Sequence, residues 1–259
     1  MVIVVHFSPA KEKRVDSGFY AACAGLMART QTLELAANNL ANVNTTGYRS
    51  QQPTFRTLLA QSSSTGLNRY AAAVNDFGVV GGSSLDQAQG SLERTGSPLD
   101  LAVEGPGYLA VQTADGVRYT RNGNLKLSKD RQLQTSSGDP VLGTGGQPVR
   151  MPEGEVSIST DGTISVGGAL AGQLRMVEFP AGTPMTQVGS SYYSAPSAAA
   201  SPAKSSQLRQ GMLESSNVNP VAAAVGLIAL QRNAEMLTRA MSSFHNDLNR
   251  MAAEDLPKV

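Results

Sequence analysis

Three carboxylates in the middle of the chain are the first candidates for chemistry. Glu93, Asp100 and Glu104 lie close together in the sequence. Glycoside hydrolysis needs two carboxylates flanking the scissile bond, one of which acts as the general acid. Asp100, however, falls in an alternating strand pattern, and no aromatic platform for a sugar accompanies the three acids. We therefore expect them to lie at solvated or strand-edge positions, and we predict no catalytic residue.

Other reactive residue types are too sparse to build a site. The chain has two histidines, His6 and His245, and one cysteine, Cys23. This excludes a Cys/His zinc cluster and an internal disulfide, and it leaves the serines without a plausible histidine partner. The glycine-rich runs 105–107 and 143–146 lack P-loop and dinucleotide-binding spacings, so we expect turns there. No cofactor and no metal ion are predicted.

The composition excludes several classes of partner. The net charge is +1 and charged residues make up 16% of the chain, which predicts no nucleic-acid binding. Tryptophan is absent and aromatics make up 5%, which does not favour a pocket for a small-molecule substrate. No apolar run approaches the ~20 residues of a membrane span, so no membrane insertion is expected.

Both ends of the chain carry seven-residue apolar repeats, the pattern of helices that pack in coiled coils. The N-terminal repeat runs through Leu26, Leu33 and Leu40. The C-terminal repeat has two series, which include Leu227, Leu230, Leu237, Met241, Phe244 and Leu248. We expect these residues to form an assembly interface, because a lone monomer has little with which to cover both stripes.

Asparagine, glycine and proline mark the inner ends of both helices. Asn38, Asn39, Asn42 and Gly47 close the first helix, because asparagine and glycine tolerate the left-handed backbone that ends helices. Asn217, Asn219 and Pro220 open the second, with an asparagine cap ahead of a first-turn proline. These side chains cap the helices locally or also bond between subunits, and both interpretations stay open.

Between the helices the apolar period changes to two, with Asp-Gly, Asn-Gly and Gly-Gly turns. Asp115-Gly116 and Asn122-Gly123 predict hairpins, and Asp161-Gly162 and Gly167-Gly168 predict further turns. The predicted fold class is therefore α+β, with long N- and C-terminal helices that form a coiled-coil-type region and, between them in the sequence, a central antiparallel all-β domain. The expected divisions are a helix over 15–45, an extended connector over 46–84, the β domain over 85–194, a flexible linker over 195–211 and a C-terminal helix over 212–254.

Residues 1–14 are expected to be a non-native or disordered extension. Val15 reads as a start codon translated as valine, and a helical pattern begins straight after it. The opening apolar stretch is also too short for a secretory signal and carries its basic residues on the wrong side.

Three blocks, in order, give the chain a family resemblance. They are ANNLANVNTTGY at 37–48, GSLERTGSPLDLAVEGPGY at 90–108 with YTRNG at 119–123, and GMLESSNVNPV at 211–221 with LIALQRNAE at 227–235. The sequence resembles the flagellar axial proteins of bacteria, the rod and hook subunits, and within them the basal-body rod proteins of the proximal type. The alanines at 222–224 and the Asn-Ala-Glu run at 233–235 depart from the pattern of that type.

The resemblance implies a structural subunit that polymerises through its terminal helices into the drive shaft of the flagellum. It implies helices packed in the inner tube of the rod and a β domain in an outer layer. The expected partners are copies of itself, other rod subunits and the export apparatus, with ring proteins as further candidates. The expected location is the periplasm-spanning rod, after type III export from the cytoplasm without a cleaved signal peptide.

Three alternatives remain open from the sequence. One is a distal rod or hook-type subunit of the same family. Another is a soluble β-domain enzyme or carbohydrate-binding module acting on peptidoglycan. The third is an autonomous coiled-coil oligomer that is not exported.

Overall fold

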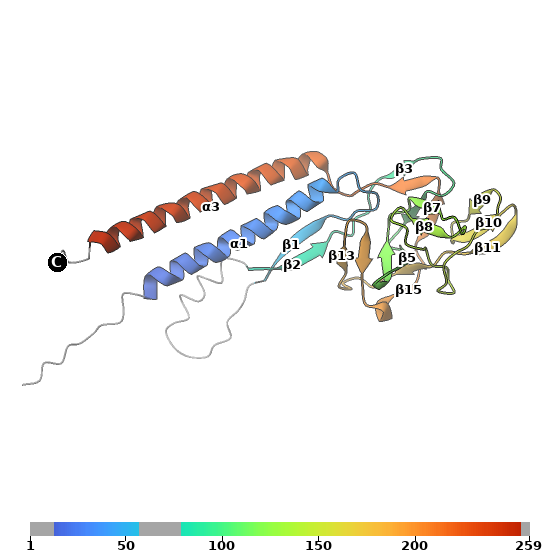
Figure 1. Ribbon diagram of the computed structural model, residues 1–259, viewed down its shortest axis with the longest axis horizontal. Helices are drawn as coiled ribbons and strands as arrows, with labels where there is room; N and C mark the ends of the chain where they lie inside the picture. Colours follow the sequence, from blue (N-terminus) through green and yellow to red (C-terminus); the bar gives the residue numbers. More distant parts are fainter. Residues whose placement is uncertain (1–12, 57–78, 255–259) are drawn as a thin grey trace, which may run out of the picture. The chain divides into compact units, whose positions relative to one another are not determined.

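The computed structural model describes residues 13–56 and 79–254 (Figure 1). The chain divides into two compact units. The first contains the stretches up to Ala37, Pro53–Ser83 and the chain from Val221 onward, and the second contains Asn38–Gln52 and Ser84–Pro220. We refer to the second as the β unit. The expected extension 1–14 lies almost wholly outside the described residues.

Two long helices carry the apolar repeats, and each is continuous in Figure 1. Helix α1 spans Lys13–Ala41 and helix α3 spans Pro220–Glu254. Proline begins α3 as predicted, because its missing N–H is not needed in the first turn of a helix. The C-terminal helix was expected from residue 212, but Met212–Glu214 form a strand instead.

The predicted connector contains paired strands at its two ends. Strand β1 (Gln51–Arg56) and strand β2 (Val79–Leu85) form a two-stranded sheet. The residues between them, 57–78, lie outside the described part of the chain.

The β unit is built on a six-stranded antiparallel sheet with smaller sheets around it. In spatial order its strands are β13 (Thr186–Val188), β14 (Tyr192–Ser194), β6 (Gly116–Thr120), β5 (Tyr108–Thr113), β12 (Met176–Glu178) and β15 (Ser201–Pro202). A three-stranded sheet contains β9 (Val156–Ile158), β10 (Thr163–Val166) and β11 (Ala169–Gln173). The remaining pairs are β7 (Leu125–Leu127) with β8 (Leu133–Thr135), β4 (Leu101–Glu104) with β16 (Gln207–Gln210), and β3 (Leu92–Arg94) with β17 (Met212–Glu214).

Apolar side chains lie on both faces of the large sheet. Leu109 and Val111 of β5 belong to one buried cluster, whereas Tyr108 and Ala110 belong to another. Because successive side chains of a strand point to opposite faces, the two clusters lie on opposite sides of the sheet. The predicted antiparallel β domain therefore has a core on each face.

The segment expected to be a flexible linker, 195–211, is instead part of the β unit. It contains the short 3₁₀ helix η1 (Ser197–Ala199), β15 and β16. In β16 Leu208 pairs with Val103 of β4 and is buried in the core. The Ala-Pro-Ser composition gave no sign of this strand. Its place in the β unit depends on one buried leucine and on backbone hydrogen bonds, which composition does not reveal.

The predicted turns are partly confirmed. Asp115-Gly116 joins β5 to β6, and Asp161-Gly162 joins β9 to β10. The prediction of a hairpin at Asn122-Gly123 is wrong, since β6 and β7 belong to different sheets. Glycine is required there for another reason, because a Cβ at Gly123 would lie 1.5 Å from the carbonyl oxygen of Leu101.

Candidate functional site

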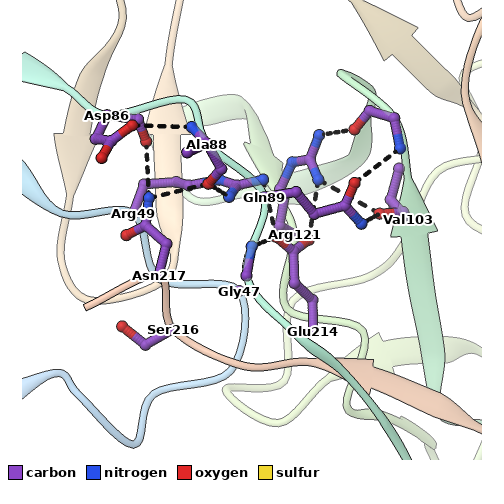
Figure 2. A network of polar contacts seen from close by, with 12 residues as sticks. Gly47, Arg49, Asp86, Ala88, Gln89, Val103, Arg121, Glu214, Ser216 and Asn217 are labelled. Atoms are coloured by element: carbon purple, nitrogen blue, oxygen red, sulfur yellow. Dashed lines mark hydrogen bonds and ion pairs between the residues drawn. The ribbon is translucent and has the colours of Figure 1, made fainter. Parts of the chain in front are cut away.

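A buried carboxylate joins three distant parts of the chain in the β unit. Glu214, the last residue of β17, receives Arg49 Nη2 at 2.8 Å on Oε1 and Arg121 Nη1 at 2.9 Å on Oε2. All three side chains are almost completely buried. Figure 2 shows both guanidinium groups converging on this carboxylate. We call residues 47–50, 86–90, Arg121 and 214–217 the polar joint.

Hydrogen bonds to the Tyr193 hydroxyl fix the backbone at Arg49. Its N–H donates to the Tyr193 hydroxyl at 3.0 Å, and that hydroxyl donates to the carbonyl of Gly47 at 3.1 Å. Burial raises the pKa of Tyr193, so the phenol stays protonated and can donate. Gly47 has φ +68°, and a Cβ there would lie 2.4 Å from the carbonyl carbon of Arg121. The predicted helix-ending glycine is thus also a contact point of the polar joint.

Backbone carbonyls satisfy most of the other guanidinium donors. Arg49 donates to the carbonyl of Ala88, and Arg121 donates to those of Val103 and Gly105. The Arg121 guanidinium also lies 5.0 Å from the centre of the Tyr108 ring, in cation–π contact. Among the guanidinium nitrogens of Arg49 and Arg121, only the two Nε atoms are buried without a hydrogen-bond partner in the described part of the chain.

The charge of the buried ion triad formed by Arg49, Arg121 and Glu214 is not balanced, because two guanidinium groups share one carboxylate. Burial lowers the pKa of Arg49, the neighbouring Arg121 charge lowers it further, and Glu214 acts in the opposite direction. Removing one partner of a buried ion pair typically costs 3–5 kcal/mol, since an uncompensated charge remains. Loss of Glu214 would leave two such charges in the core.

Asn217 makes a second set of bonds in the same place. Its Oδ1 accepts the N–H of Ser50 at 2.7 Å, and its Nδ2 donates to the carbonyls of Asp86 at 3.1 Å and Ala88 at 3.0 Å. Its own N–H donates to the carbonyl of Tyr48 at 3.3 Å. One side chain therefore joins the segment that follows α1, the segment that follows β2 and the segment that leads into α3.

The predicted helix-end asparagines divide into local and long-range roles. Asn42 acts locally, because its N–H bonds the carbonyl of Asn38 and its Oδ1 accepts the Thr45 hydroxyl. Asn39 reaches further, with Oδ1 accepting the Tyr48 hydroxyl at 3.0 Å and the Gln51 N–H at 2.8 Å. Asn219 lies exposed directly before Pro220.

The predicted interface residues lie on the two helices at the expected spacing. All those whose side chains are described are partly buried: Leu26, Leu33, Leu40, Leu227, Leu230, Leu237 and Met241. Phe244 and Leu248 belong to α3, but their side chains lie outside the described part. The assembly role of this set stays a prediction.

The three carboxylates considered for catalysis are each engaged by a different partner. Glu93 accepts the Ser215 hydroxyl at 2.5 Å, Asp100 accepts Asn124 Nδ2 at 3.4 Å, and Glu104 pairs with Arg209 at 2.7 Å. Within the described residues no cluster of histidine, cysteine and acidic side chains could hold a metal ion. None of the described helices is long and apolar enough to cross a membrane.

Sequence reasoning missed the ion triad, although two of its members lie in the family blocks. Arg121 and Glu214 were part of those blocks, and Arg49 directly follows the first one. A usable signal was a lone charge among turn and apolar residues in a chain poor in charges. Periodicity reveals which face is buried, but not which distant charges meet there.

Three family models match successive parts of the chain. The model of the flagella basal body rod protein matches 19–49, that of the flagellar hook protein FlgE/F/G D1 domain matches 102–166, and that of the flagellar basal body rod FlgEFG protein C-terminal region matches 209–253. The flagellar basal-body rod protein FlgF of Caulobacter vibrioides is 32% identical over 95% of this chain and 100% of its own length. The chain belongs to the flagellar basal-body rod protein family. The resemblance seen in the sequence is confirmed, including the proximal rod type.

Further relatives agree with this assignment. FlgF of Escherichia coli is 33% identical over 91% of this chain and 97% of its own length. FlgG of Bacillus subtilis, also a flagellar basal-body rod protein, is 32% identical over 82% of this chain and 89% of its own length. The chain is therefore a structural component of the flagellum that assembles with rod subunits, and not an enzyme.

The three charged residues of the polar joint that form the ion triad each fall in a region that a family model matches. Arg49 closes the first matched region, Arg121 lies in the second and Glu214 in the third. Each member of the ion triad thus comes from a different region of this rod protein.

Proposed function

We propose that this rod subunit polymerises through the apolar stripes of α1 and α3, and that the polar joint fixes the inner ends of both helices to the β unit. The rod family supports assembly with other rod subunits. The expected coiled-coil-type packing of the helices, type III export without a cleaved signal, and contacts with export and ring components belong to the proposal.

Exposed apolar side chains on α3 support assembly through this helix. Val221, Val225, Ile228 and Met236 are 72%, 63%, 53% and 60% exposed. The first three follow the i, i+4, i+7 spacing of one helical face. Burying a side chain of this kind is worth about 1.5–3 kcal/mol, so neighbouring subunits have several such contributions to gain. This face adds to the predicted stripe of partly buried leucines.

The polar joint supports a role in transmitting force. The carboxylate of Glu214 is the observation that carries this part of the proposal, because it binds Arg49 from the exit of α1 and Arg121 from the β unit at the same time. A drive shaft must pass torque between helices and outer domain without the chain giving way at the connection. A buried, hydrogen-bonded ion triad resists displacement, since any opening leaves a charge without a partner.

Leu237→Asp in the full-length subunit tests polymerisation through α3. We expect folded, exported protein with little incorporation into basal bodies and loss of swimming, because the carboxylate would have to be buried among neighbouring helices. Ser243→Asp is the matched control, since Ser243 is exposed on the same helix. Normal incorporation of Leu237→Asp would exclude the proposed interface.

A further inference from the structure

A pocket of about 350 Å³ lies at one end of the large sheet in the β unit. Its lining includes the turn at 144–146, the residues Arg175 and Val177 of the β12 region, and Ala200 and Pro202 near β15. A Cβ at Gly145 or Gly146 would meet nothing within 4 Å, so this side of the pocket is open. The pocket thus combines an apolar wall, a polar turn and one cation.

The cation is Arg175. Its backbone N–H and carbonyl are both hydrogen-bonded. Its N–H donates to the carbonyl of Leu142 at 2.9 Å, and its carbonyl accepts the N–H of Ala110 at 3.1 Å. Within the described residues its partly buried guanidinium makes no hydrogen bond or ion pair. The other buried or partly buried arginines of the β unit all donate from the guanidinium: Arg49, Arg118, Arg121 and Arg131. Arg175 is therefore available to an anion from outside.

The chain itself presents a matching group in the loop before β9. Glu155 is exposed, and within the described part its carboxylate has no partner. In the same loop the side chain of Glu153 is 90% exposed and lies 3.8 Å from Arg131. Most carboxylates of the β unit are already engaged by the chain's own donors, as Glu93, Glu104 and Glu178 illustrate. Glu153 and Glu155 are two exposed carboxylates only two residues apart in this loop.

We infer that the Arg175 pocket receives the Glu155 loop of a second copy of this chain. The pocket and the loop are different surfaces, so the contact is heterologous, and contacts of this kind continue from subunit to subunit instead of closing in a pair. Transfer from water into the pocket strengthens the attraction between guanidinium and carboxylate. This inference rests on the proposed polymerisation and adds a contact between outer domains to the one between helices.

Cysteine cross-linking in assembled rods tests the contact directly. The full-length chain is expressed in a Cys23→Ser background with Arg175→Cys and Glu155→Cys, together and singly, and basal bodies are isolated and oxidised. We expect a ladder of disulfide-linked dimers and higher oligomers with the pair, and no cross-linked species with either single variant. Assembled basal bodies that contain the pair variant but show no cross-link would overturn the inference, while leaving the helix-mediated assembly intact.

Charge reversal gives a second, independent test. Arg175→Glu and Glu155→Arg should each reduce incorporation by about tenfold, because like charges would then meet at the contact. Combining both changes should restore incorporation to near the wild-type level. Lys129→Glu and Asp115→Arg, at exposed turns elsewhere in the β unit, are the matched controls. Wild-type incorporation of Arg175→Glu, or no restoration in the double variant, would contradict the inference, whereas failure of the proposed function would appear with Leu237→Asp alone.

Discussion

Arg49 and Glu214 lie far apart in the sequence, and their side chains meet at 2.8 Å in the buried interior of the β unit. The pair makes the β unit dependent on both of its flanking segments. The segment that follows α1 supplies the guanidinium, and the strand that precedes α3 supplies the carboxylate. The β unit is therefore completed only when β17 has joined it.

Glu214→Gln should destabilise the β unit by about 3 kcal/mol, because two guanidinium groups would lose their shared counter-charge. Urea unfolding of the full-length subunit, followed by near-ultraviolet circular dichroism, measures the change. Glu93→Gln is the control, since Glu93 is exposed and its carboxylate accepts the Ser215 hydroxyl. We expect the control to stay within about 0.5 kcal/mol of the wild type. Equal effects of the two substitutions would argue against the polar joint as a stabilising element.

Gly47→Ala should cost about 1–3 kcal/mol, because the residue has φ +68° and a Cβ would press on the carbonyl of Arg121. Gly145→Ala is the matched control, since a Cβ there meets nothing within 4 Å. The same unfolding measurement compares the two variants. A Gly47→Ala protein as stable as the wild type would show that the turn after α1 can move away from Arg121.

Truncation should separate folding of the β unit from assembly. A chain that ends before Asn219 keeps Glu214 and Asn217, so we expect a folded β unit that does not enter basal bodies. A chain that ends before Gly211 loses both residues and β17, and we expect it to unfold because Arg49 and Arg121 stay buried without a counter-charge. Circular dichroism and basal-body incorporation are the measurements. Equal stability of the two truncated chains would contradict the account of the polar joint.

Acid should destabilise the turn at 204–206 that follows β15, because Glu178 binds this turn through its carboxylate. Burial alone would raise the pKa of Glu178, but hydrogen bonds from the Ser206 hydroxyl, from the Ser205 and Lys204 N–H groups and from the Ser205 hydroxyl lower it below its usual value of 4.5. A carboxyl with a depressed folded-state pKa contributes stability above its unfolded-state pKa and loses it as the pH falls through the folded-state pKa. The free energy of unfolding should therefore decrease below about pH 4.5.

Two variants identify Glu178 as the source of that acid sensitivity. Glu178→Gln cannot lose a charge, so its unfolding free energy should change less with pH over the same range than that of the wild type. Ser206→Ala removes one of the hydrogen bonds to the carboxylate and should reduce the pH dependence in the same direction. Urea unfolding at a series of pH values gives the slopes. Identical slopes in Glu178→Gln and the wild type would exclude this carboxylate as the source.

Residue types that are close together in the sequence correctly predicted where helices begin and end and where tight turns lie. Pro220 begins α3, Asp115-Gly116 turns β5 into β6, and the Asn-rich segment ends α1, because helix starts, tight turns and helix ends are decided by a few neighbouring residues. The family blocks led to the rod proteins for a related reason, since short motifs persist in order along the chain. The predicted coiled-coil seam has the expected spacing on both helices, and its packing stays a prediction.

The tertiary structure decided what depends on distant partners. Periodicity did not indicate that Leu208 would pair with Val103, that Gly123 would lie against Leu101, or that Arg49 and Arg121 would share Glu214. An isolated charge in a sequence is usually solvated, and it becomes part of a core only when the fold brings an opposite charge to it and excludes water. The sequence by itself therefore determined the helices, the β character of the middle and the family, whereas the folded chain decided where its two ends are joined, because ion pairing and strand pairing depend on proximity in space.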